Sequence, residues 1–208
     1  MDAVSLAPLA KAPALVRLDL ESNELGDLTP LGSIATLREL WFTGTKFTAP
    51  NSLSALTQVE RLYVGGTQLA DATPLAALTQ LTELTLNSNP NLANFNALST
   101  LVNLTRLDAA STGISSATAI GSMTKLTYLD LYFDNIADIS PLQGLLQLQT
   151  LALNSNPVTD IAPLVANTGL GAGDFVYLPG TSLDCQAGQA THVATLIGRG
   201  VTVTSPCN

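Results

Sequence analysis

Leucine and other aliphatic residues recur along this chain at intervals of 22 residues. Each copy follows the pattern L-x-x-L-x-L-x-x-N-x-L, with polar residues between the apolar ones. The first position of the pattern is held by Leu15, Leu37, Val59, Leu81, Leu104, Leu126 and Leu148. One step is 23 residues long because of the pair Pro90-Asn91, and a degenerate eighth copy runs from Val176 to Leu183. Seven copies in one register indicate a repeat architecture, in which each copy is one structural unit.

The spacing within each copy predicts its secondary structure. The Leu-x-Leu alternation is typical of a short strand whose apolar side chains point inward. Proline cannot continue a strand ladder, so Pro30, Pro74, Pro141 and Pro163 predict a turn or a short 3₁₀ segment. One copy cannot bury its own apolar face, and stacked copies share a continuous core. We expect an α/β solenoid over residues 1–183, with about eight repeats of which the first is partial, a parallel sheet on the concave face and 3₁₀ segments on the convex face.

Two polar positions of the repeat are assigned to structure. The Asn position of the pattern is held by Asn23, Thr45, Thr67, Asn89, Thr112, Asp134, Asn156 and Thr181. A side chain with a donor and an acceptor at this position satisfies backbone groups of neighbouring turns that water does not reach. Asp134 is the exception, because an ionised carboxylate only accepts hydrogen bonds. The aspartates at 27, 71, 138 and 160 are also expected to be structural.

Residues 184–208 are expected to form a C-terminal cap. Apolar residues between Gly188 and Gly198 have helical spacing, and residues 201–203 are typical of a final strand. The chain has two cysteines, Cys185 and Cys207, and neither a C-x-x-C spacing nor a histidine cluster that would favour zinc. We favour a disulfide between them, which implies an oxidising compartment. Two free thiols remain the alternative.

The repeat resembles the 22-residue leucine-rich repeats of bacterial internalin-like surface proteins. The resemblance covers residues 5–183 and includes the convex segment that reads Asp138-Ile139-Ser140-Pro141-Leu142 in the sixth copy. It implies the leucine-rich-repeat fold, but such solenoids bind very different partners. The family usually has a helical N-terminal cap, whereas this sequence opens in mid-repeat with Leu6-Ala7-Pro8-Leu9. An uncapped repeat implies edge-to-edge association with further repeats.

The first residues and the composition of the chain argue against several classes of protein. Residues 1–4 show neither a basic nor an apolar signal region, so an exported form would be a mature chain or a fragment. No apolar run reaches 18 residues, so we expect no membrane insertion. The formal charge of −8 argues against nucleic acid, whose phosphates require a basic surface.

One outward column of the predicted sheet alternates in charge. The residue before the second leucine of the pattern is Arg17, Glu39, Arg61, Glu83 and Arg106 in the first five copies. Opposite charges on neighbouring strands stabilise a sheet by about 0.2–1 kcal/mol per pair. We favour such a lateral ladder of salt bridges over a ligand-binding role for this column.

Most aromatic residues gather on the expected concave face. Seven of the ten lie on or beside its outward columns: Trp41, Tyr63, Tyr128, Tyr132, Phe133, Phe175 and Tyr177. Phe42, Phe47 and Phe95 occupy core positions instead. The plain alternative is that aromatic residues suit strands, but a concentration on one face usually marks a contact surface.

The aromatic residues of this face fall into two groups: Trp41 with Tyr63 near the N-terminal end, and a C-terminal group that predicts a shallow recess. In the C-terminal group the aromatic residues of the sixth strand, Tyr128, Tyr132 and Phe133, face Phe175 and Tyr177 two strands away, a separation of about 10 Å. The strand between them offers only the small side chains Thr150, Ala152 and Asn154. We expect the recess to accept a sugar ring or a side chain of a partner.

The acidic and titratable candidates for chemistry are few. Asp108 and Asp130 are predicted lateral neighbours of like charge, with Arg106 close enough to relieve their repulsion. Calcium is the alternative, but it needs six or more oxygen ligands. The same pair is the one candidate for glycoside hydrolysis, and its open setting argues against that. The single histidine, His192, belongs to the cap. We therefore expect no catalytic residue, no metal site and no cofactor.

These observations favour a non-catalytic recognition module, secreted or on the cell surface. Its ligand would be a protein or a glycan bound through the concave face. The candidate contact residues are the seven aromatic residues of that face together with Arg106, Asp108, Asp130 and Ala152. The alternative is a structural spacer or assembly segment of a larger surface protein, which the exposed N-terminal repeat edge favours.

Overall fold

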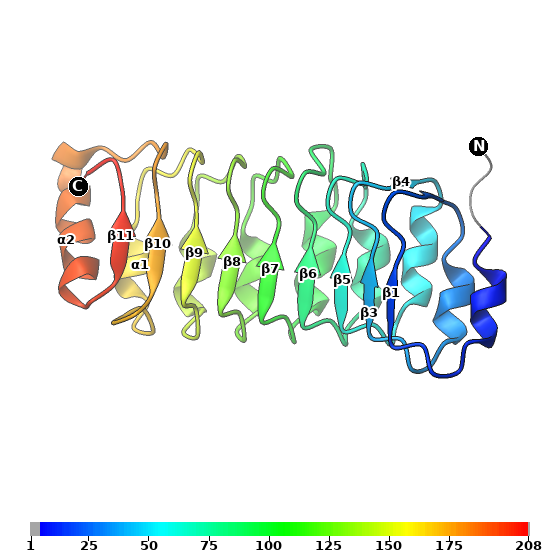
Figure 1. Cartoon of the computed structure of the whole chain (residues 1–208). Helices are drawn as coiled ribbons and strands as arrows, with labels where there is room; N and C mark the ends of the chain where they lie inside the picture. The colour runs from blue at the N-terminus through cyan, green and yellow to red at the C-terminus, as the bar shows by residue number, and fades with distance from the viewer. Residues whose placement is uncertain (1–4, 208) are drawn as a thin grey trace.

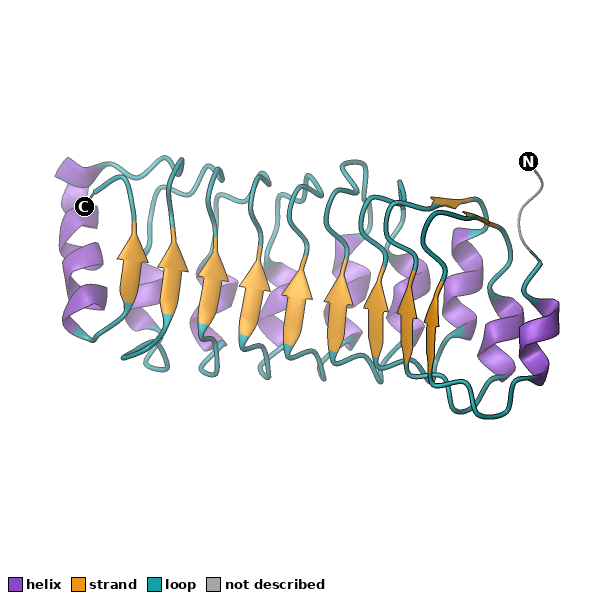
Figure 2. Cartoon of the chain, viewed as in Figure 1, coloured by secondary structure: helices purple, strands orange, loops and turns teal. Residues whose placement is uncertain are grey.

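The computed structural model describes residues 5–207, which form one row of stacked coils (Figure 1). The main strands lie side by side on one side of the row, and the short helices of the repeats lie behind them (Figure 2). This arrangement confirms the predicted leucine-rich-repeat solenoid. The prediction made for residues 1–4 lies outside the described residues. We call the outward surface of the main sheet the concave face.

In the described residues the main sheet has nine strands, all parallel, in the order β1-β3-β5-β6-β7-β8-β9-β10-β11. Their bounds are Arg17–Asp19 (β1), Glu39–Trp41 (β3), Arg61–Tyr63 (β5), Glu83–Thr85 (β6), Arg106–Asp108 (β7), Tyr128–Asp130 (β8), Thr150–Ala152 (β9), Phe175–Tyr177 (β10) and Thr202–Thr204 (β11). Equal repeat positions are paired, as Leu107 is with Leu129. The register therefore places each outward column of the sequence in a straight row across the concave face.

A small second sheet, which the repeat pattern did not predict, lies near the N-terminal end. It pairs β2, Glu24–Leu25, with β4, Lys46–Phe47, in parallel. The Lys46 ammonium donates to the Glu24 carboxylate at 2.6 Å, and this ion pair joins the two strands. Water screens such a surface pair, so it adds little to the stability of the fold.

Short helices cross the side opposite the main sheet, one in each coil. The 3₁₀ helices are Ala7–Lys11 (η1), Thr29–Ser33 (η2), Pro50–Ala55 (η3), Thr73–Ala77 (η4), Phe95–Thr100 (η5), Thr118–Ser122 (η6) and Ser140–Gly144 (η7). Proline occupies the first turn of η2, η4 and η7, where the missing N–H costs nothing. The prediction of a turn or 3₁₀ segment is wrong at Pro163, because this proline begins a one-turn α-helix, Ala162–Ala166 (α1).

The four aspartates on the convex side form hydrogen bonds at the start of the short helices, in line with the structural role expected for them. Asp27, Asp71, Asp138 and Asp160 each accept a backbone N–H from the residue two places ahead, at 2.8–2.9 Å. Hydrogen bonds from these following residues lower the pKa of all four carboxyls.

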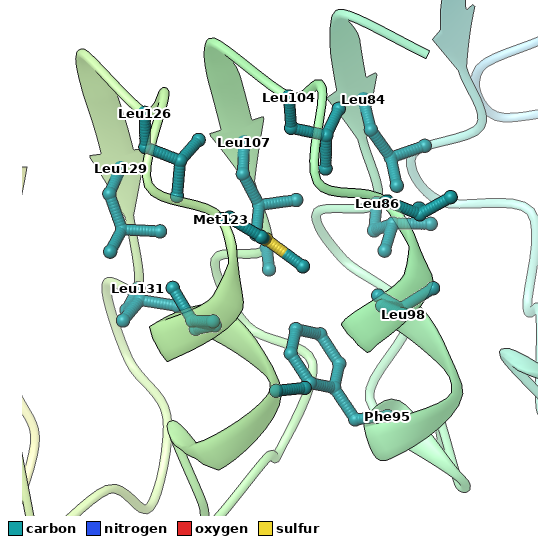
Figure 3. Packing of buried hydrophobic residues seen from close by; sticks show 14 of the residues in the cluster. Leu84, Leu86, Phe95, Leu98, Leu104, Leu107, Met123, Leu126, Leu129 and Leu131 are labelled. Atoms are coloured by element: carbon teal, nitrogen blue, oxygen red, sulfur yellow. The ribbon is translucent and has the colours of Figure 1, made fainter. Parts of the chain in front are cut away.

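Aliphatic side chains fill the space between the sheet and the helices. In the middle of the solenoid, leucines of β6, β7 and β8 lie in successive layers, with Phe95, Leu98 and Met123 beside them (Figure 3). Leu84, Leu107 and Leu129 are fully buried, and each such burial stabilises the fold by about 1.5–3 kcal/mol. The core is shared by neighbouring repeats, so no repeat is stable alone.

The Asn position of the repeat forms a buried ladder from Thr45 to Asn156, whereas Asn23 is exposed and bonds only within its own coil. The Asn89 side chain donates to the carbonyls of Val64 and Leu86 and accepts the N–H of Leu69. Asn156 repeats this pattern three coils further on. Each amide thus satisfies buried backbone groups of two adjacent coils.

The C-terminal end closes with a helix and a strand. A π-helical turn, Cys185–Gln189 (η8), leads into α2, Ala190–Gly198, and β11 follows. The final strand begins at Thr202, one residue later than predicted. A disulfide joins Cys185 to Cys207, which confirms the predicted pairing and ties the segment that follows β11 to the turn before α2.

Candidate functional site

The aromatic residues of the concave face form two separate groups, as predicted. The first, which we call the N-terminal patch, consists of Arg17, Trp41 and Tyr63. The rings of Trp41 and Tyr63 are stacked with centroids 5.2 Å apart, and the Arg17 guanidinium lies 5.2 Å from the Trp41 centroid. The patch is therefore a flat, rigid surface of two rings with a cation at one end.

The predicted ladder of charges extends over part of its column. Glu39 forms ion pairs with both Arg17 and Arg61, its neighbours on either side. The prediction is wrong for the next two members of the column. Glu83 accepts a hydrogen bond of 2.9 Å from the Tyr63 hydroxyl, and Arg106 lies over the Tyr128 ring, 3.5 Å from its centroid. This column therefore links the charge ladder to both aromatic groups.

The second group surrounds a hollow of about 350 Å³, which we call the C-terminal slot. Its lining residues are Tyr128, Asp130, Tyr132, Thr150, Ala152, Asn154 and Tyr177. The walls come from β8, the segment after it and β10, while β9 and the residues that follow it supply the small side chains between them. The slot is thus the recess expected from the sequence.

Two aromatic residues assigned to the recess lie outside its lining. Phe133 follows the wall residue Tyr132, and Phe175 stacks beside Tyr177 with centroids 6.4 Å apart. Phe133 is 62% exposed and Phe175 is 41% exposed. They extend the apolar surface next to the slot instead of forming its walls.

The sequence placed Asn154 among the small side chains of the recess and Asp130 among the candidate contact residues, but it did not predict that Asp130 holds the walls of the slot. The Asp130 carboxylate accepts the Tyr132 N–H at 2.9 Å and the Tyr128 hydroxyl at 3.3 Å, so it fixes two walls. The side-chain oxygen of Asn154 is buried without a hydrogen-bond donor among the described residues. Both residues fall on outward columns, which was the available signal.

The Asp108 and Asp130 side chains occupy neighbouring strands, as predicted. Burial raises the pKa of Asp108, and the charge of Asp130 raises it further, while a hydrogen bond from the Ala110 N–H and the charge of Arg106 lower it. Arg106 therefore relieves the repulsion only in part, because its guanidinium lies against Tyr128.

The other candidate sites contain fewer groups that could bind or react with a ligand. A larger hollow of about 650 Å³ lies beside η5, lined by Leu92, Phe95 and Ile114 together with small and amide residues, and its lining has no charged side chain. His192 lies on α2, 3.3 Å from Gln189 and 3.8 Å from Asp160, away from the concave face.

Among residues 5–207 no group of three His, Cys, Asp or Glu could hold a metal ion. No helix in that range is long and apolar enough to cross a membrane.

Comparisons with known proteins locate this chain in a family. No family model matches the sequence, and no curated protein matches it. Solved structures do match, among them internalin C2 from Listeria monocytogenes, with a TM-score of 0.74 and 30% identity over 85% of this chain and 74% of that one. The internalin InlF of the same bacterium has a TM-score of 0.55 and 20% identity, over 97% of this chain and 72% of that one.

A third solved structure, the functional domain of InlJ from Listeria monocytogenes, includes a cysteine ladder. It is 19% identical, with a TM-score of 0.66 over 99% of this chain and 46% of that chain. At these identities InlF and InlJ support the fold alone. The match to internalin C2 goes further, because its identity extends over most of both chains. Together with the 22-residue repeat and the parallel sheet, it shows that this chain belongs to the internalin family of leucine-rich-repeat proteins.

Proposed function

We propose that this chain is a non-catalytic recognition module that binds its partner through the concave face. A leucine-rich-repeat fold of the internalin type suggests a protein-interaction module, so a protein is the first partner to test and a glycan the second. The observation that carries the proposal is the C-terminal slot, whose aromatic walls stand around small side chains on an open surface. Exposed aromatic residues of this kind supply much of the energy of protein interfaces.

The N-terminal patch supports the same proposal. Stacking holds Trp41 and Tyr63 in place before any partner binds, so little side-chain entropy is lost on association. The patch and the slot lie on the same sheet with β6 and β7 between them. A partner of ordinary size can therefore contact both areas at once.

We also propose that the module acts outside the cell, either secreted or displayed on a surface. The disulfide between Cys185 and Cys207 supports this location, because disulfides persist in oxidising compartments.

The test is a screen of displayed peptides, extracellular protein domains and a glycan array against the native chain. Each ligand found would be titrated with Ala152→Trp, in which an indole fills the slot. We expect affinity to fall about tenfold or more, as for the loss of an interface hot spot. Gln143→Trp, on the exposed surface of η7, is the matched control. Ligands that bind Ala152→Trp and Trp41→Ala as tightly as the native chain would contradict binding through the concave face.

A second candidate function is assembly through the edge of β1. In the described residues β1 pairs only with β3, and Leu15 and Leu18 are half-buried although their equivalents Leu37 and Leu40 are fully buried. Sedimentation at rising protein concentration separates the two candidates. Self-association that Val16→Lys abolishes would favour assembly, and a monomer throughout would favour the recognition module.

A further inference from the structure

The walls of the C-terminal slot combine aromatic faces with a carboxylate. Tyr128, Tyr132 and Tyr177 line the hollow together with Asp130. The face of an aromatic ring attracts a cation, and the attraction grows when the cation is shielded from water. A hydrogen bond from the Tyr128 hydroxyl to Asp130 couples one of these rings to the carboxylate.

The chain already shows that one of these rings holds a cation. Arg106 stacks on Tyr128 with its guanidinium carbon 3.5 Å from the ring centroid. Arg106 comes from β7 and does not line the slot, whereas Tyr128 does. Arg106 thus contacts the Tyr128 ring from outside the slot, and no cationic side chain of the described residues contributes to the slot lining.

The charges at the slot itself are few. The Asp130 carboxylate is the one charged group in the lining, and the Arg106 guanidinium lies on the Tyr128 ring outside the lining. The C-terminal part of the chain is acidic as a whole, because after Lys125 the sequence contains six aspartates, at 130, 134, 138, 160, 174 and 184, and Arg199 is the one Lys or Arg. This net negative charge favours the approach of a positively charged partner, over a range of about 10 Å at moderate salt.

A neutral occupant would fit this site less well. Any ligand that fills the slot removes water from Asp130, and a carboxylate that loses water without gaining a positive partner is destabilised. A cation compensates that loss. An N–H carried by the same ligand could also satisfy the side-chain oxygen of Asn154, which has no donor among the described residues.

We propose that the C-terminal slot binds the side chain of a lysine or arginine on a basic segment of the partner protein. This inference rests on the proposed recognition function and names the chemistry of the partner. The alkyl part of that side chain packs between the tyrosines over Ala152, and its charged end lies beside Asp130.

The experiment uses the whole 208-residue chain labelled with ¹⁵N, together with three small probes. These are the acetylated amides of lysine, arginine and norleucine, of which norleucine is the neutral counterpart of lysine. We expect lysine and arginine to shift the backbone amide signals of Thr150, Ala152 and Asn154 in a saturable way, with norleucine much weaker. In Asp130→Asn the affinity for the cationic probes should fall about three- to fivefold, the range for one partly exposed charge.

Asp138→Asn is the matched control, because it removes one carboxylate charge on η7's side of the molecule. It should leave the affinity for lysine within experimental error. Equal shifts with norleucine and lysine, or no shift of the three slot signals with any probe, would overturn the cation proposal. Loss of partner binding in Ala152→Trp together with full binding in Asp130→Asn would overturn it while leaving the recognition function in place. Full binding in both variants would overturn the slot as a binding site, and full binding in Trp41→Ala as well would contradict the recognition function itself.

Discussion

At the scale of single residues, one backbone position in each repeat has a positive φ. It directly precedes the Asn position and is held by Ser22, Gly44, Gly66, Ser88, Ser111, Phe133, Ser155 and Gly180, with φ between 56° and 75°. Seven of the eight are serine or glycine. Phe133 is the exception, and it is 62% exposed, so burial of its ring does not compensate for the unfavourable backbone. The fold gives no reason for a phenylalanine at this position. We therefore attribute Phe133 to the proposed contact surface beside the slot.

Phe133→Gly is expected to stabilise the chain by about 1 kcal/mol, because glycine adopts this backbone conformation without steric cost. The same variant should weaken partner binding, since it removes exposed aromatic surface. Urea denaturation measures the first effect, with Ser155→Gly as the control for backbone alone. A Phe133→Gly chain less stable than the native one would show that the ring contributes to the fold.

A second residue-scale departure is Asp134, at the Asn position. One of its carboxylate oxygens accepts from Thr112 and Gly113, and the other is buried without a partner among the described residues. Burial raises its pKa to about 6, against the effect of those hydrogen bonds. The folded chain therefore holds this proton more tightly than the unfolded chain. As the pH rises from about 4 to about 6, Asp134 ionises more readily in the unfolded chain than in the folded one, so the free energy of unfolding should fall progressively. This loss of stability should persist at higher pH.

Asp134→Asn should remove that pH dependence and stabilise the chain at pH 7 by about 1–3 kcal/mol, because the amide nitrogen can donate to backbone carbonyls as Asn156 does. Thermal unfolding from pH 4 to pH 7.5 measures the difference between the two chains. The reverse change, Asn156→Asp, should introduce a similar loss one coil further on. A native chain and Asp134→Asn with parallel stability curves would contradict this account.

At the scale of elements, the sequence predicted the strands and most convex helices, because each depends on local spacing and on proline. It did not predict that α1 would be α-helical or that β2 and β4 would pair, since small differences in loop geometry decide both. The candidate site was likewise predicted only in part. Periodicity placed Tyr128, Ala152 and Tyr177 on one face, but side-chain orientation decided that Phe133 and Phe175 lie outside the slot and that Arg106 stacks on Tyr128.

The C-terminal cap provides the element-scale prediction. The disulfide between Cys185 and Cys207 closes a loop with a sequence separation of 22, for which the chain-entropy model gives about 3 kcal/mol of stabilisation. Cys185→Ser should therefore lower the melting temperature by several degrees. Calorimetry of the double variant Cys185→Ser/Cys207→Ser is the control, and it should match the single variant. An unchanged melting temperature in both would show that α2 and β11 are held by packing alone.

At the scale of the whole molecule, stability is distributed along the row of coils, because each repeat packs only against its neighbours. Leu107 lies in the middle of this row and is fully buried (Figure 3). Leu18 is its equivalent in β1 and is half-buried. The same substitution should therefore have different effects at the two positions.

Leu107→Ala is expected to destabilise the chain by about 3 kcal/mol, through lost burial and the cavity that remains. Leu18→Ala should cost about 1 kcal/mol, because less of its side chain is removed from contact. Urea denaturation of both variants measures the difference. Equal losses would mean that the edge coil is packed as tightly as the middle of the solenoid.

The fixed register of the sheet also determines how recognition by this chain can diverge. The N-terminal patch and the C-terminal slot are separated by the two complete strands β6 and β7. Gain or loss of one repeat between them would change their separation by one strand spacing, about 4.8 Å, without altering a residue in either contact area. Under the proposed function, duplication or deletion of a repeat would therefore suit partners whose complementary features are spaced differently, while the residues of each contact area stay the same.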